Sequence, residues 1–155
     1  MKVLIIDDYR SHGESLVELV NVLGHDAEYA PSYSEAEWLL SVLSFDLALL
    51  DFDMPQMTGP MIAVRLTKRF PKVRPVIMSA HAPDQERRKE IGSLTFLQKP
   101  LTREQLENLF ADLVREQQRG DLMLRASFPI LKIEGTTAER TTPSSPEISS
   151  EGDEE

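Results

Sequence analysis

Polar side chains that could carry out chemistry follow several short apolar runs of this sequence. They are three carboxylates, one hydroxyl and one amine: Asp7, Asp8, Asp51, Ser79 and Lys99. Three carboxylates held together repel one another and are costly to remove from water, unless a cation lies among them. Mg²⁺ prefers such oxygen ligands, and a carboxylate can accept a phosphoryl group as an acyl phosphate. An ammonium and a hydroxyl can then stabilise the phosphoryl oxygens. The pattern favours Mg²⁺-dependent phosphoryl transfer, with Asp51 as the acceptor.

The elements that position these side chains form a regular alternation. Continuous apolar runs, typical of strands buried on both faces of a parallel sheet, cover residues 3–6, 47–50, 76–78 and 94–97, with a weaker strand at 27–30. Helical patterns lie between the strands, and the third and fourth of them cover about residues 59–70 and 84–91. A (βα)₅ order predicts an α/β fold, a doubly wound five-stranded parallel sheet with helices on both faces. Its strand tips bring the polar side chains together.

Helix ends are marked by local signals. Capping-box patterns begin at Ser11, Ser34 and Thr102, where a hydroxyl and a carboxylate or amide can satisfy free backbone donors. Gly24 and Gly120 are the expected C-terminal stops. Residues 1–119 are therefore expected to form the domain, and residues 120–155 an acidic tail rich in Ser, Thr, Pro and Glu that is disordered. A short apolar stretch at 128–133 could dock on a surface, but it is interpreted as part of a solvated linker.

Composition excludes several classes of function. The chain has 155 residues, no Cys and a formal net charge of -9, with two basic and seven acidic residues within 126–155. A surface for nucleic acid needs clustered Lys and Arg, so no nucleic-acid contact is expected. No run approaches the roughly 18 apolar residues of a membrane span, and no signal peptide is recognisable. We expect a cytoplasmic protein without membrane contact.

The motifs resemble those of the bacterial two-component receiver domain, and the chain is similar to the chemotaxis response regulator. The resemblance covers about residues 1–119 and rests on four short segments. They are Ile5-Ile6-Asp7-Asp8, Leu49-Leu50-Asp51-Phe52-Asp53-Met54-Pro55 with Gly59, Ser79-Ala80, and Lys99-Pro100 after Phe96. The resemblance implies a flavodoxin-like fold with strand order 2-1-3-4-5.

The resemblance also implies roles and partners. Asp8 would ligate Mg²⁺ directly with help from Asp7, Asp51 would ligate it and be phosphorylated, and Asp53 would offer its backbone carbonyl. A sensor histidine kinase or phosphotransfer protein would donate the phosphoryl group from a phosphohistidine, and the output would reach a downstream protein target. The chain would be a monomer or a weak phosphorylation-dependent dimer. It would be no enzyme beyond self-directed phosphotransfer and autodephosphorylation.

A switch and a control of phosphoryl lifetime are expected from the same resemblance. The Ser79 hydroxyl would move toward the phosphoryl group and let Phe96 turn inward, which changes the surface of the fourth helix, fifth strand and fifth helix. Asp53 lies two positions after Asp51, and His81 lies two positions after Ser79. Both side chains would overhang the phosphoryl group. We hypothesise that they interact and set its lifetime. The charged run 85–90 is interpreted as a solvated face, whose basic residues could pair with a partner or a second copy.

Two other functions compete with this prediction. Asp51 and Asp53 after an apolar strand also resemble the nucleophile and general acid of a haloacid-dehalogenase-type phosphatase. Chain order argues against that family, because it places its nucleophile near the start and further acidic ligands after the Lys. A phosphorylation-independent interaction module is disfavoured because all five key positions are intact.

Overall fold

A computed structural model describes residues 1–127 of the chain. The chain divides into two units, Met1–Gln117 and Gln118–Glu155, and each is described by itself. Residues 128–155 of the expected tail lie outside the described range, so their disorder remains a prediction, whereas residues 120–127 are helical. Within residues 1–127 no helix has both the length and the apolar character that crossing a membrane requires.

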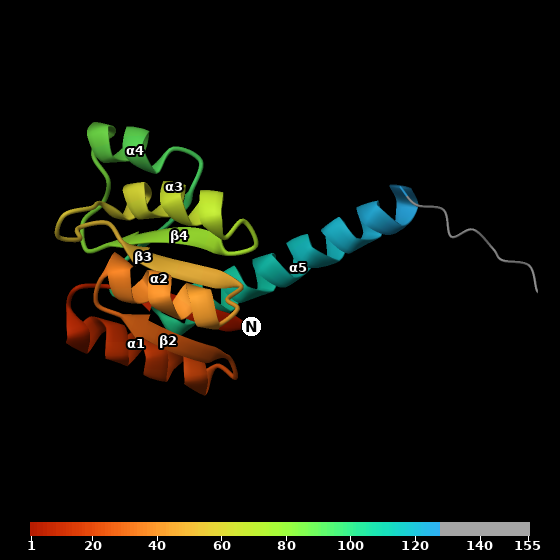
Figure 1. Ribbon diagram of the computed structural model, residues 1–155, viewed down its shortest axis with the longest axis horizontal. Coiled ribbons are helices and arrows are strands. Elements are labelled where there is room, and N and C mark those ends of the chain that lie inside the picture. The colour runs from red at the N-terminus through yellow and green to blue at the C-terminus, as the bar shows by residue number, and fades with distance from the viewer. Residues whose placement is uncertain (128–155) are drawn as a thin grey trace, which may run out of the picture. The chain divides into compact units, whose positions relative to one another are not determined.

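Five parallel strands form one sheet in the order β2-β1-β3-β4-β5, and a helix follows each strand (Figure 1). The strands are β1 (Lys2–Ile6), β2 (Asp26–Ala30), β3 (Leu47–Asp51), β4 (Arg74–Ser79) and β5 (Thr95–Gln98). The helices are α1 (Arg10–Val22), α2 (Tyr33–Val42), α3 (Gly59–Arg69), α4 (Gln85–Ile91) and α5 (Arg103–Ser127). The predicted (βα)₅ fold and its strand order are confirmed.

The register of the sheet aligns the strand tips that carry the polar residues. Ile6 of β1 lies beside Leu50 of β3, so the residue after each of them, Asp7 and Asp51, falls at the same edge. Ser79 at the end of β4 pairs with Gln98, the last residue of β5, which places Lys99 next along the same edge.

Two apolar layers cover the two faces of the sheet. On one face, side chains of α2, α3 and α4 pack on alternate strand residues such as Leu4 and Leu50. On the other face, α1 and α5 pack on the residues between them, including Ile5 and Leu49. All five residues of β3 are buried. The central strand is therefore fixed from both sides, and each buried Leu or Ile contributes about 2 kcal/mol.

Two predicted N-terminal caps are wrong. Helix α2 begins one residue after Ser32, whose Oγ accepts the Glu35 N–H at 3.3 Å, so Ser34 lies inside the helix. Helix α1 begins after Tyr9, which makes no side-chain cap, so Ser11 is likewise inside. Both helices begin earlier than the hydroxyl patterns suggested.

Of the three other predicted helix ends, those at Thr102 and Gly24 are confirmed and the one at Gly120 is wrong. Thr102 and Gln105 form the expected reciprocal cap, with the Thr102 N–H on Gln105 Oε1 at 2.9 Å and the Gln105 N–H on Thr102 Oγ1 at 3.2 Å. Gly24 has φ +84° and follows the end of α1, as predicted. Gly120 does not end α5, which continues to Ser127. A single Gly costs a helix only about 1 kcal/mol, which its helix-forming neighbours offset.

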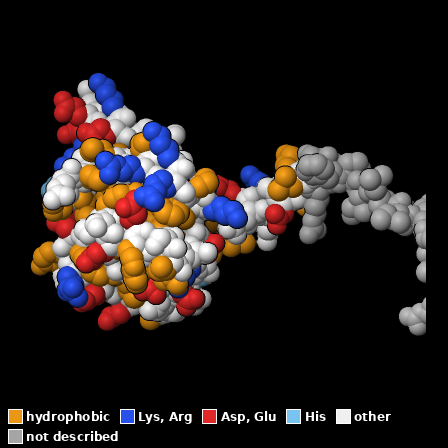
Figure 2. All heavy atoms as spheres, in the orientation of Figure 1, with side chains coloured by type: hydrophobic (Ala, Val, Ile, Leu, Met, Phe, Trp, Pro, Cys, Tyr) orange, Lys and Arg blue, Asp and Glu red, His pale blue; other side chains and the backbone are white. Residues whose placement is uncertain are grey.

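Helix α4 is the least embedded helix of the first unit. It has seven residues, of which Ile91 alone is buried. Asp84 caps it by accepting the Arg87 N–H at 2.9 Å. Acidic and basic side chains gather around this helix (Figure 2). All residues of the run 85–90 except Arg87 are exposed, so most of this run forms the solvated face that the sequence indicated.

Candidate functional site

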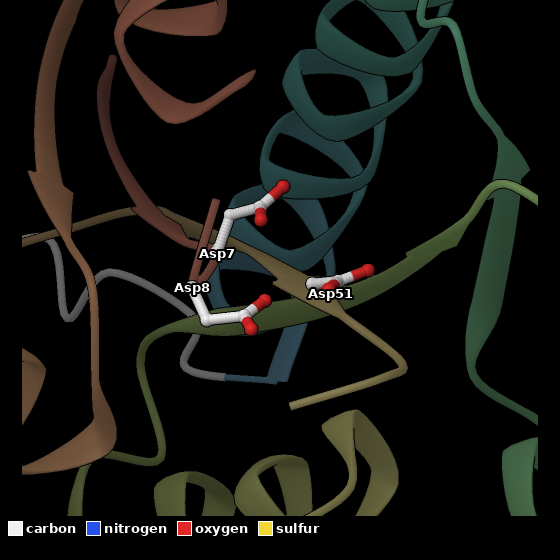
Figure 3. A group of neighbouring side chains, drawn as sticks. All are labelled: Asp7, Asp8 and Asp51. Carbon is white, nitrogen blue, oxygen red and sulfur yellow. The ribbon is translucent and has the colours of Figure 1, made fainter. Parts of the chain in front are cut away.

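Three carboxylates meet at the carboxyl edge of the sheet. Asp7 and Asp8 follow β1 and Asp51 ends β3, and one oxygen from each lies within 4.8 Å of the others. Their side chains point the same way (Figure 3). Asp7 and Asp51 are 0% and 7% exposed, whereas Asp8 is open to solvent. This oxygen-only cluster fits a hard divalent cation, with Asp8 on the accessible side.

Lys99 neutralises part of this charge. Its ammonium lies 2.7 Å from Asp7 Oδ2 and 3.0 Å from Asp51 Oδ1. Its backbone N–H donates to the Ser79 carbonyl at 2.8 Å, which fixes the chain as it leaves β5. Burial lowers the pKa of Lys99, but the hydrogen bonds to Asp7 and Asp51 outweigh it and leave the pKa raised. Lys99 is therefore a firmly charged group between two carboxylates.

The pKa of Asp51 is raised from its ordinary value. Burial is the largest cause; Lys99 opposes it, and the charges of Asp7 and Asp8 add to it. The Lys99 ammonium thus does not fully offset the burial of Asp51 and the charges of its two neighbouring carboxylates. A bound cation would lower the electrostatic cost of ionised Asp51.

Asp7 is held by the segments on either side of it. Its Oδ1 accepts the Tyr9 N–H at 2.9 Å, and its carbonyl accepts the Tyr29 hydroxyl at 2.7 Å. The Tyr29 ring lies directly against Gly13 of α1, where an added Cβ would fall 2.1 Å from a ring carbon. The position of Asp7 therefore depends on contacts from both α1 and β2.

The backbone at Asp51 is closely packed against the start of α3. The Gly59 N–H donates to the Phe52 carbonyl at 3.0 Å, and a Cβ at Gly59 would lie 2.6 Å from the Asp51 carbonyl oxygen. Thr58 caps α3 by accepting the Met61 N–H at 3.4 Å. The start of α3 consequently touches the main chain of the candidate acceptor.

The two residues expected to form the switch lie on the neighbouring strands β4 and β5. Ser79 is 1% exposed, and its hydroxyl accepts the His81 N–H at 3.3 Å. Phe96 is half-buried and packs against the core layer of α2, α3 and α4. The His81 side chain is exposed, and within residues 1–127 no hydrogen bond or ion pair joins it to Asp53. The hypothesised Asp53–His81 interaction is absent from this structure.

Asp53 instead pairs with Arg87, which the sequence interpretation left on a solvated face. The guanidinium binds both carboxylate oxygens, with Nη1–Oδ2 at 3.0 Å and Nη2–Oδ1 at 2.8 Å. Nη1 also lies 3.4 Å from Ser79 Oγ, and the guanidinium carbon is 4.5 Å from the centre of the Phe52 ring. No periodic apolar signal in the run 85–90 marks position 87 as facing inward.

A largely apolar groove of about 340 Å³ opens beside Lys99. It runs between α1 and the segment after β5, and its lining includes Leu16, Leu19, Pro100 and Leu101. Lys99 lines this groove and contacts Asp7 and Asp51, so the groove adjoins the carboxylate cluster.

Comparison with known proteins decides the family. The sequence model of the response regulator receiver domain matches residues 3–111. The chain belongs to the response regulator receiver family. A response regulator receiver protein of Anaeromyxobacter sp. is 31% identical over 102 residues, which are 64% of this chain and 43% of that protein. The sensor protein TorS of Escherichia coli is 28% identical over 130 residues, which are 82% of this chain and 14% of that protein.

Solved structures agree with this receiver assignment at the level of the fold. A CheY-like receiver domain protein from Methanospirillum hungatei superposes with a TM-score of 0.68 at 22% identity, covering 76% of this chain and 97% of that one. A receiver domain protein from Clostridium thermocellum gives 0.66 at 23% identity, covering 76% and 96%. This chain spans less than half the length of the two curated relatives.

As a receiver domain, the chain is a phosphoacceptor of two-component signalling. The curated relatives include sensor proteins, sensor histidine kinases and response regulators. The family match favours this function over the phosphatase alternative.

Proposed function

We propose that this receiver domain accepts a phosphoryl group on Asp51 from a phosphohistidine, with Mg²⁺ bound. The observation that carries the proposal is the placement of Asp51. It is buried at the end of the central strand, 3.0 Å from the Lys99 ammonium and within 4.8 Å of two further carboxylates. Chemistry of this kind depends mainly on alignment and on neutralising the phosphoryl oxygens.

In the transfer, an ionised Asp51 oxygen forms a bond to phosphorus as the bond from phosphorus to the donor imidazole breaks. The electron pair of that bond returns to the imidazole nitrogen. Lys99 favours the ionised form of Asp51 and is positioned to neutralise a phosphoryl oxygen. Ser79 can donate its hydroxyl to another such oxygen.

Asp7, Asp8 and Asp51 would hold Mg²⁺, and family resemblance adds the backbone carbonyl of Asp53. The cation would supply positive charge for the phosphoryl oxygens. The all-oxygen donor set and the raised pKa of Asp51 support this assignment.

We assign the donor to a sensor histidine kinase or phosphotransfer protein, which would dock at the groove beside Lys99. The output would pass to a downstream protein through the surface of α4, β5 and α5. Ser79 would move toward the phosphoryl group, and Phe96, now half-buried, would turn inward. We place the signalling domain within residues 1–119, although α5 itself extends to Ser127.

A labelling experiment tests the acceptor. The wild-type chain is treated with a small-molecule phosphodonor, with Mg²⁺ or with excess chelator, and intact and peptide masses are measured. We expect one added phosphoryl group, on Asp51, only with Mg²⁺. The control is Asp26→Asn, an exposed carboxylate at the far end of β2, which should label normally. Full labelling of Asp51→Asn, or equal labelling in chelator, would contradict the proposal.

A further inference from the structure

Arg87 joins α4 to three residues of the site region. It pairs with Asp53 through two nitrogens, approaches the Ser79 hydroxyl and lies over the Phe52 ring. Phe52 and Asp53 directly follow the acceptor Asp51 in the chain. Arg87 is thus a second cation close to the phosphoryl position, and unlike Lys99 it comes from a helix at the surface.

We propose that Arg87 couples α4 to the phosphorylation state of Asp51. Its guanidinium binds the Asp53 carboxylate in the unmodified domain and moves to bind the phosphoryl group once that group forms. This inference rests on the proposed phosphorylation of Asp51. It adds a phosphoryl-contacting residue that acts alongside Ser79 and Lys99.

The geometry makes the transfer short. Arg87 Nη1 already lies 3.4 Å from Ser79 Oγ, the hydroxyl proposed to bind a phosphoryl oxygen. A guanidinium binds phosphate oxygens in the same forked geometry that it uses here for a carboxylate. We therefore expect that movement of the Arg87 side chain is enough to exchange one anion for the other.

The charges favour the exchange. The Arg87 and Asp53 side chains are 29% and 50% exposed, so solvent weakens their ion pair. A phosphoryl group carries about 1.5 to 2 negative charges near pH 7, and it replaces the single charge of the ionised Asp51 carboxylate. The site beside Ser79 therefore gains up to about one negative charge, in a more buried position than the Asp53 carboxylate. Arg87 therefore has a stronger partner available after phosphorylation than before it.

Few other contacts hold α4 in place. Ile91 is its one buried residue, Asp84 caps its start, and Arg88 Nε donates to the Pro83 carbonyl at 3.0 Å within the same segment. A change of partner by Arg87 is consequently transmitted to the first turn of α4. That turn belongs to the surface proposed for the downstream target.

A plain structural clamp is the alternative, in which Arg87 binds Asp53 in both states. The two ideas differ in what Asp53 does after modification. If Arg87 transfers, Asp53 matters to α4 only in the unmodified domain, whereas Arg87 matters in both. If Arg87 is a clamp, removing either partner has the same effect in both states.

Hydrogen exchange of the backbone amides of residues 85–91 separates these outcomes. The full chain is measured with Mg²⁺, with and without beryllofluoride as the phosphoryl analogue, for wild type, Asp53→Asn and Arg87→Met. Without beryllofluoride we expect both variants to exchange several-fold faster than wild type in α4. With beryllofluoride, Asp53→Asn should return to the wild-type rate and Arg87→Met should not. Equal behaviour of the two variants in both conditions overturns the transfer.

Fluorine NMR of bound beryllofluoride supplies the second readout. Arg87→Met should bind the analogue about tenfold more weakly, the loss of one charge-assisted contact. The adjacent variant Arg88→Met is the matched control and should bind as wild type does. Normal binding by Arg87→Met overturns the inference while the acceptor assignment stands. No bound signal in wild type removes both.

Discussion

The two cations near Asp51 are held in opposite ways. The Lys99 side chain is 12% exposed and is shared by two buried carboxylates from β1 and β3. Arg87 is 29% exposed and pairs with a half-exposed carboxylate, from a helix with one buried residue. The strand-tip pocket, formed by Asp7, Asp51 and Lys99, is therefore fixed by the sheet. The α4 face, which carries Arg87, is held by contacts that water weakens. The fixed arrangement around Lys99 suits phosphoryl transfer, and the weakly held arrangement around Arg87 suits signalling.

The largest expected effect comes from removing each cation in turn. Lys99→Met removes the ammonium shared by the buried carboxylates of Asp7 and Asp51, so the free energy of unfolding should fall by about 3 kcal/mol. Arg87→Met breaks a partly exposed pair and should lower it by less than about 1 kcal/mol. Urea unfolding at pH 7 in chelator measures both. Arg103→Met, from an exposed pair with Glu107, controls for the added apolar side chain. Similar losses for Lys99 and Arg87 would break the comparison.

A smaller effect is expected where α3 meets the acceptor strand. An Ala at Gly59 places its Cβ against the Asp51 carbonyl, so Gly59→Ala should lower the free energy of unfolding by about 2 kcal/mol and slow the labelling of Asp51. Gly120→Ala is the control, since a Cβ there meets nothing within 4 Å and a helix gains up to about 1 kcal/mol from Ala. Denaturation and mass-spectrometric labelling rates would be read together. A neutral Gly59→Ala would show that the pocket is less rigid than described.

The smallest expected effect is a rise in the free energy of unfolding rather than a fall. The pKa of Asp51 is raised in the folded state, so ionised Asp51 destabilises the fold above that pKa, relative to the unfolded chain. Asp51→Asn should therefore raise the free energy of unfolding at pH 7 by about 1 kcal/mol. The gain should shrink as pH falls through the folded pKa and vanish below the ordinary value of 3.8, where both states are protonated. Unfolding from pH 3 to 8 in chelator tests this.

Asp53→Asn is the matched variant on the α4 face. It removes a half-exposed partner of Arg87 rather than a buried charge that Lys99 offsets only in part, so it should bring no gain in stability at pH 7. A stabilising Asp53→Asn, or a destabilising Asp51→Asn, would reverse the assignment of the two carboxylates.

The strand-tip pocket could be predicted from the sequence because its signals are local and strong. Continuous apolar runs mark the strands, and parallel topology alone brings Asp7, Asp51 and Lys99 to one edge. The α4 face could not be predicted in the same way. Every position in the run 85–90 is polar, and Arg87 is selected by Asp53 and Phe52, which lie more than thirty residues away in sequence.

The predicted starts of α1 and α2 were wrong for a related reason. Ser32 and Ser34 are two residues apart, and a hydroxyl pattern by itself does not choose between them. Tyr9 precedes α1 as its N-cap and makes no side-chain cap, and its own N–H donates to Asp7 Oδ1 at 2.9 Å. The start of that helix is thus set by a site residue rather than by a capping motif.

The contact between Gly13 and Tyr29 constrains how this receiver can evolve. The ring occupies the space where any larger residue at position 13 would place its first carbon, and its hydroxyl supports the main chain at Asp7. Neither position can change alone without disturbing the carboxylate. Among descendants of this chain, a side chain gained at 13 should be accompanied by a smaller residue at 29. The pair would then be inherited as a unit, although neither residue touches the phosphoryl group.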